Sequence, residues 1–193
     1  MRQIVLHNGR IIDTCVYCNG RAQSREHVIA RCFLSGGKGI RMPQVPACRS
    51  CNRTFARVED ALSSMLRNSD QIERILHAGD PDLQPGDKKV YSRIQKHSAY
   101  LGRKIGCGLV AYRWGELVAS SCFGPVRVGS EAFRDGLIWS AAIEGSWPIR
   151  DFHEPEQNPY AFIRHEGSIH VVISLGVLHL AVQCPEFRTE GVL

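Results

Sequence analysis

The chain has 193 residues, of which 44% are hydrophobic and 22% charged, and its formal net charge is +5. This composition is ordinary for a soluble globular protein and supplies enough apolar residues for a core. No run of about 18 apolar residues occurs, which argues against a transmembrane helix. The apolar stretch near Met1 is also too short for a signal peptide. We therefore expect a cytoplasmic protein with no membrane partner.

The positive charge is concentrated in the first third of the chain. Residues 1–70 contain 11 Lys and Arg against 5 Asp and Glu, whereas residues 71–193 contain 13 against 14. A localised basic surface is typical of proteins that bind polyanions, and nucleic acid is the commonest of these. The charge distribution therefore favours a nucleic-acid partner.

The first third divides into short elements. A β-branched stretch over residues 24–30 predicts a strand that leads into a helical turn, and residues 35–39 form a glycine-rich loop. Two brief strands, over residues 2–6 and 10–13, are expected around a turn at Asn8-Gly9. Residues 49–66 predict a helix, because apolar side chains recur at helical spacing at Phe55, Val58, Leu62 and Met65.

The rest of the chain indicates a second region of mixed helix and strand. Residues 78–87 are rich in Pro, Gly and Asp, so we place a linker there, between a module over 1–77 and a C-terminal region over 88–193. An amphipathic helix capped by Ser130 is expected over 131–144. The fold class is thus α+β, and the C-terminal sheet is left open as a dimer interface, a recognition surface or a second core. Its strands are expected at 160–165, 168–175 and 177–183, and another strand or pair of strands is expected at 109–121.

Four of the eight cysteines form two Cys-x-x-Cys pairs, Cys15 with Cys18 and Cys48 with Cys51. Cytoplasmic thiols stay reduced, so a disulfide framework is not expected. Each pair forms a turn that directs two thiolates to one point, and 29 residues separate the pairs, which predicts a tetrahedral structural zinc site. The isolated cysteines are expected to be small buried hydrophobes: Cys32, Cys107, Cys122 and Cys184.

Residues between and beside the cysteine pairs resemble the HNH, or ββα-metal, endonucleases in their four-cysteine, zinc-stapled form. The resemblance covers about residues 10–66 and lies in Cys15-x-x-Cys18, in Arg25-Glu26-His27-Val28-Ile29, and in the segment 45–52 that ends in Cys48-x-x-Cys51-Asn52. It implies a β-hairpin packed on a helix, with an active site in the crease between them. By this resemblance the chain is an endonuclease that hydrolyses phosphodiester bonds, with DNA as its expected partner.

The resemblance also assigns roles to individual residues. His27 is implied as the general base, a role that suits an imidazole whose pKa lies near neutral. Glu26 and Asn52 are implied as ligands of a catalytic Mg²⁺ or Mn²⁺, which stabilises charge on the phosphate. Zinc is expected to hold hairpin and helix in register. Phosphate contacts are expected from Arg25, Lys38, Arg49 and Arg53.

The chain departs from the family pattern in two places. Ala30 stands where the family often has proline, and the helix lacks the further His or Asn that often completes the metal site. Glu59 or Asp60 is expected to substitute, because carboxylates suit hard cations. Which of the two faces the ion is not decided by their spacing.

Two further functions compete with the metal-dependent endonuclease. One is a zinc-stabilised module that binds DNA or RNA without cutting it, which the missing helix ligand favours. The other places recognition of a protein or a modified base in the C-terminal region, with the nuclease as its effector. A homodimer through that region is a further expectation.

Overall fold

The computed structural model describes residues 13–33, 42–79, 81–143, 159–165 and 168–185. The two strands expected near the N-terminus and the glycine-rich loop with Lys38 lie essentially outside these ranges. Within them the elements follow in the order β1 (Ser24–His27), η1 (Arg31–Phe33), β2 (Gln44–Ala47), α1 (Arg49–Leu66), α2 (Ser69–Ala78), α3 (Pro85–Trp114), η2 (Ser120–Cys122), β3 (Val126–Gly129), α4 (Glu131–Ile143), β4 (Tyr160–His165), β5 (Ser168–Leu175) and β6 (Leu178–Gln183).

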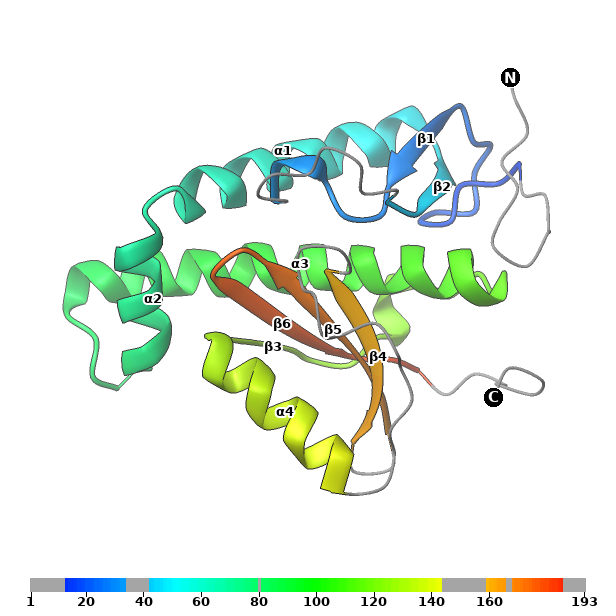
Figure 1. Cartoon of the computed structure of the whole chain (residues 1–193). Helices are drawn as coiled ribbons and strands as arrows, with labels where there is room; N and C mark the ends of the chain where they lie inside the picture. Colours follow the sequence, from blue (N-terminus) through cyan, green and yellow to red (C-terminus); the bar gives the residue numbers. More distant parts are fainter. Residues whose placement is uncertain (1–12, 34–41, 80, 144–158, 166–167, 186–193) are drawn as a thin grey trace.

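The elements stack in layers on either side of the long helix α3 (Figure 1). The β1–β2 hairpin and α1 cover one side of α3, and a four-stranded sheet covers the other. Helix α4 packs on the far face of that sheet, against β4 and β6. Helix α2 connects α1 to the start of α3 at one end of the molecule.

The hairpin and α1 form a compact ββα unit. Strands β1 and β2 are antiparallel, with His27 opposite Gln44 and Ser24 opposite Ala47. Helix α1 has the predicted bounds, and its buried face includes Phe55, Glu59 and Leu62. These three residues recur at the helical repeat, so they lie on one side of α1 and face the rest of the protein. The sequence prediction of a strand followed by a helical turn over 24–30 agrees with β1 and the adjoining η1.

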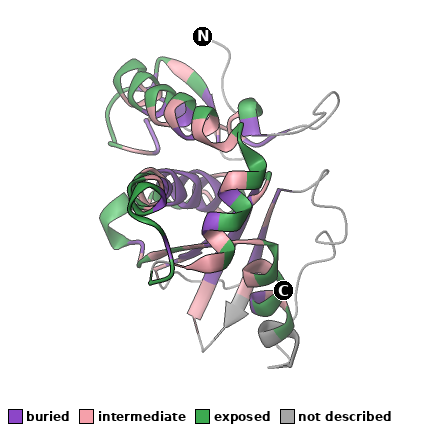
Figure 2. Cartoon of the chain, turned by 90° about the vertical axis from the view of Figure 1, so that its left-hand side faces the viewer, coloured by how far each residue is buried: buried purple, intermediate pink, exposed green. Residues whose placement is uncertain are grey.

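Helix α3 occupies the centre of the protein, and it corrects the sequence prediction. The expected strand over 109–121 is wrong, because Leu109 to Trp114 form the last turns of α3. Residues 104–111 are buried on all sides of the helix, as the purple centre of Figure 2 shows, so their apolar run has no helical period. Gly108 permits this close packing, since a Cβ there would lie 2.8 Å from Val28 on the hairpin side.

The sheet has the order β3-β6-β5-β4 and is antiparallel throughout. The three strands expected between residues 160 and 183 are confirmed, as is the helix over 131–143. Strands β5 and β6 are buried on both faces because α3 and α4 cover the sheet. Strand β3, which joins the edge of β6, was not anticipated from the sequence.

One hydrophobic cluster extends across the expected module boundary. It contains Val28, Val45 and Leu62 from the ββα unit together with residues of α3, β5 and β6. The stretch 78–87 begins with the last residue of α2 and ends with the first three residues of α3. Among the described residues, no helix is long and apolar enough to cross a membrane.

The isolated cysteines differ in burial. Cys107 and Cys184 are buried, as expected for small hydrophobes. Cys32 and Cys122 are exposed, which corrects the prediction for these two. Both belong to single 3₁₀ turns, η1 and η2, which lie where the chain runs over the surface between larger elements.

Candidate metal centre and the adjoining buried lysine

The four paired cysteines meet at one point. The sulfur atoms of Cys15, Cys18, Cys48 and Cys51 all lie within 4.8 Å of one another, and Sγ of Cys18 is 3.7 Å from Sγ of Cys48. A tetrahedral zinc ion with Zn–S bonds of about 2.3 Å separates its sulfurs by roughly 3.8 Å. The prediction that these residues form one cluster is confirmed, and the cluster has the geometry to hold a metal ion.

Each pair is positioned by its own backbone turn. In the first, the backbone N–H of Cys15 donates to the carbonyl of Gly20, and Asn19 adopts a positive φ of 59°. Asn tolerates this left-handed conformation better than most residues. In the second, Cys48 is the N-cap of α1, and its sulfur accepts from the backbone N–H of Cys51 at 3.3 Å. A turn and a helix start thus present the four sulfurs to one ion.

The acidities of the thiols differ within the cluster. The N–H of Cys51 lowers the pKa of Cys48 to about 7. Burial and the neighbouring sulfurs of Cys48 and Cys18 raise the pKa of Cys51 instead. Burial likewise raises the pKa of Cys15. Several thiolates cannot share so small a volume without a positive ion to offset their repulsion.

A buried lysine lies beside this centre. The Lys104 side chain is 0% exposed, and its Nζ donates to Oε1 of Glu26 and to Oε1 of Glu59, both at 2.8 Å. It also donates to the backbone carbonyls of His27 at 2.9 Å and Val28 at 3.1 Å. One ammonium group from α3 therefore joins both strand β1 and helix α1, which lie on the same side of α3.

This cluster contains more negative than positive charge. Two carboxylates, 7% and 8% exposed, surround one ammonium. Burial raises the pKa of Glu26, an effect that Lys104 opposes and Glu59 reinforces. Burial and, next, the charge of Glu26 raise the pKa of Tyr17, whose hydroxyl has no hydrogen-bond partner among the described residues.

His27 lies on the other face of β1, because successive strand residues alternate. Its Nε2 is 2.8 Å from the amide nitrogen of Gln44, its partner across the hairpin. An amide nitrogen only donates, so the imidazole accepts through Nε2 and carries its proton on Nδ1. Burial, and then the charge of Arg31, lowers the pKa of His27, which keeps the ring neutral at pH 7.

The other residues expected at the catalytic metal are distributed differently. Asn52 donates from its amide to the hydroxyl of Ser24 at 3.2 Å. Glu59 is buried and faces the hairpin, whereas Asp60 is exposed on the outside of α1. The structure therefore brings Glu26 and Glu59 together around Lys104. It places Asn52 beside Ser24, the first residue of β1.

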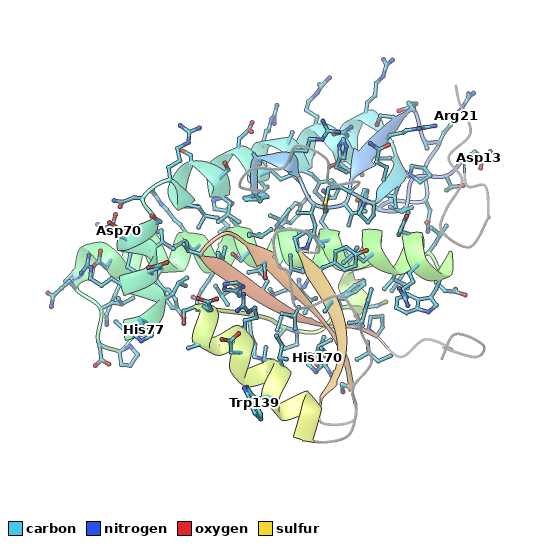
Figure 3. All side chains as sticks on the ribbon, in the orientation of Figure 1. Asp13, Arg21, Asp70, His77, Trp139 and His170 are labelled. Atoms are coloured by element: carbon cyan, nitrogen blue, oxygen red, sulfur yellow. The ribbon has the colours of Figure 1, made fainter. Side chains whose placement is uncertain are left out.

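Exposed arginines line the outer side of α1. Arg49, Arg53 and Arg57 follow one another at four-residue spacing, which aligns them along one face over about 12 Å. Figure 3 shows nitrogen-tipped side chains that project from this side of α1, away from the rest of the molecule. Among the described residues none of the three forms an ion pair. Arg25, on β1, is exposed as well.

A cleft of about 680 Å³ lies elsewhere, between α2, the start of α4 and the β5–β6 turn. At its edge the hydroxyl of Ser174 is 3.0 Å from Nδ1 of His179. Burial lowers the pKa of His179 to about 4, so this imidazole is neutral at pH 7. The cleft is separate from the cysteines and from the arginine face of α1.

Lys104 is the residue that sequence reasoning missed. It lies 45 positions from Glu59 and 78 from Glu26, in a stretch with no motif. The one available signal was its place among apolar residues, in Leu101 to Ala111, where a lysine is buried only if it is paired. Comparisons with family models, curated proteins and solved structures give no match to this chain.

Proposed function

We propose that this chain is a zinc-stapled module that binds nucleic acid through the outer face of α1 and does not cut it. The observation that carries the proposal is the row of Arg49, Arg53 and Arg57, exposed and without acidic partners among the described residues. Unpaired guanidinium groups in a line suit the phosphates of a nucleic-acid backbone, which they can contact bidentately.

Zinc is the ion that best fits the cysteine cluster. Four sulfurs at mutual distances under 4.8 Å match its tetrahedral preference, and the soft thiolates disfavour Mg²⁺ and Ca²⁺. The ion would join the Cys15 turn to the start of α1, which carries Arg49 and Arg53. The metal therefore has a structural role: it holds the arginine-bearing helix against the hairpin.

Binding without cleavage is supported by the surroundings of the two buried carboxylates. Glu26 and Glu59 each direct an oxygen to Lys104 at 2.8 Å, so the catalytic Mg²⁺ or Mn²⁺ expected from the sequence competes with an internal ammonium group. DNA is the proposed partner, and the positive charge in residues 1–70 supplies a sequence-independent affinity.

The arginine face is tested by binding to a DNA duplex over a range of salt concentrations. We expect Arg49→Gln and Arg53→Gln to weaken binding several-fold and to lower the slope of log K against log salt by about 1 for each lost phosphate contact. Lys89→Gln is the matched control, since it removes one exposed positive charge at the far end of α3. Equal effects of all three substitutions would show that net charge alone acts, against the proposal.

Hydrolysis by the HNH mechanism is the second candidate, and the state of His27 favours it. The ring is half-buried and neutral at pH 7, as a general base requires, and it lies next to Glu26 in the chain. In this candidate Glu26 and Asn52 hold Mg²⁺ or Mn²⁺, with Glu59 beside them. Glu26 must then exchange Lys104 for the ion when substrate binds.

Plasmid DNA incubated with the zinc-loaded protein and Mg²⁺ or Mn²⁺ separates the two candidates. Under the binding-only proposal, the protein retards the plasmid without nicking it, and so does His27→Ala. Under the second candidate the wild type nicks the plasmid and His27→Ala does not. Because the pKa of His27 is lowered, that activity should stay constant from pH 8 down to the usual pKa of histidine, about 6.5, and fall only below it.

A further inference from the structure

We propose that Glu26, Glu59 and the backbone carbonyls of His27 and Val28 form a cation site whose native occupant is the ammonium group of Lys104. In this view the lysine does the work of a bound ion inside the protein. We call these four oxygens the cradle. Removing the Lys104 side chain should then convert the cradle into a site for a divalent cation.

The oxygens around Lys104 resemble the coordination shell of a hard cation. Nζ has four oxygen neighbours between 2.8 and 3.1 Å, two from carboxylates and two from the consecutive carbonyls of His27 and Val28. Carboxylate and backbone carbonyl oxygens are the ligands that Ca²⁺ and Mn²⁺ take in proteins. An ammonium group is the compact point charge among protein cations, so it substitutes for a metal ion more readily than a guanidinium does.

The charge of the cradle suits a divalent ion better than a monovalent one. Two carboxylates face one ammonium. A double positive charge would balance both carboxylates, which the ammonium leaves with one excess negative charge.

The cradle is also held in place without the lysine. Glu26 belongs to β1, which pairs with β2, and Glu59 lies in the middle of α1. Both elements are tied to the cysteine cluster at one end. Replacing Lys104 with alanine leaves a space between fixed oxygens, which must contract by about half an ångström to reach the distances of 2.3 to 2.6 Å usual for a calcium-sized ion.

This inference gives the reason for binding without cleavage, and in that respect it rests on the proposed function. The native lysine closes the cradle to Mg²⁺ and Mn²⁺, so the ββα unit keeps its shape without a catalytic ion. The claim about ion binding stands apart from nucleic acid, and it is tested without any.

The experiment is a Mn²⁺ titration of zinc-loaded protein, followed by the loss of the electron paramagnetic resonance signal of free Mn²⁺ and by thermal unfolding. We expect Lys104→Ala to bind one Mn²⁺ at least about tenfold more tightly than the wild type and to unfold at a higher temperature when Mn²⁺ is present. The double variant Lys104→Ala/Glu59→Gln should lose that binding, because one carboxylate is gone.

The experiment tests the cation site even if Lys104→Ala is unstable. Lys104→Ala that folds only when Mn²⁺ is added supports the proposal. A folded variant with wild-type affinity for Mn²⁺, equal binding by the double variant, or a chain unfolded with and without Mn²⁺ overturns it. DNA retardation by the wild type is measured in parallel, so that the proposed function and the cation site can each fail separately.

Discussion

Removal of zinc is expected to unfold the ββα unit and to abolish DNA retardation. Structural zinc contributes on the order of 10 kcal/mol or more to the folding of small cysteine-based modules. Here the ion would join the turn at Cys15 and Cys18 to the first turn of α1 at Cys48 and Cys51. Without it, the Cys15 turn and the start of α1 lose their direct connection, and the packing of the hairpin and α1 on α3 is weakened.

Amide hydrogen exchange before and after treatment with a chelator measures this effect, with the zinc content determined by mass spectrometry. Protection should fall in β1, β2 and α1, and Cys51→Ser should behave like the chelated protein. Cys32→Ser serves as the matched control, because Cys32 is an exposed cysteine of the same region outside the cluster. Full protection after complete loss of zinc would contradict the structural role.

The parts of this fold that could be predicted are those with a local signature. Helix α1 carries apolar residues at helical spacing and begins directly after a cysteine turn, so its bounds were correct. Strands β5 and β6 are separated by a turn at Gly176, which has a positive φ. Short-range patterns of this kind need no knowledge of the partner elements.

The central helix could not be predicted because burial erased its pattern. From Lys104 to Ala111 every residue is buried, so apolar side chains occur on all faces of α3 and their helical period disappears. Two of these residues are glycines, which favour neither helix nor strand and which permit close contact, as Gly108 does against Val28. A continuous apolar run of this length reads equally well as a buried strand.

The cysteine cluster of the candidate site was predicted from the sequence, whereas the pairing of its carboxylates with Lys104 was not. The spacing of the cysteines was enough to predict their cluster. The partner of Glu26 was not predictable, because it arrives from a helix 78 residues later and is chosen by tertiary packing alone. A single long-range lysine thus alters the charge balance expected around Glu26 and Glu59.

Lys104→Met is expected to cost about 3 to 5 kcal/mol of unfolding free energy in the absence of divalent cations. Methionine fills much of the same space but supplies no charge, so Glu26 and Glu59 are left facing each other in the interior. Breaking a buried ion pair by removing one partner has a cost of this size, because the remaining charge stays desolvated. An ion pair with an exposed cation contributes far less, so Arg74→Met should cost under about 1 kcal/mol, because Arg74 is 63% exposed and Asp87 keeps a hydrogen bond from Gln71.

A triple variant distinguishes lost charge balance from lost packing. Replacing Glu26 with Gln, Glu59 with Leu and Lys104 with Met removes the buried charges together, and such replacements are often close to neutral in other proteins. We therefore expect the triple variant to recover most of the stability that Lys104→Met loses, as measured by urea denaturation at constant pH with zinc present. A triple variant no more stable than Lys104→Met would mean that the contact of the Lys104 ammonium with the Phe55 ring, whose centre lies 5.4 Å from Nζ, matters more than its balance with the carboxylates.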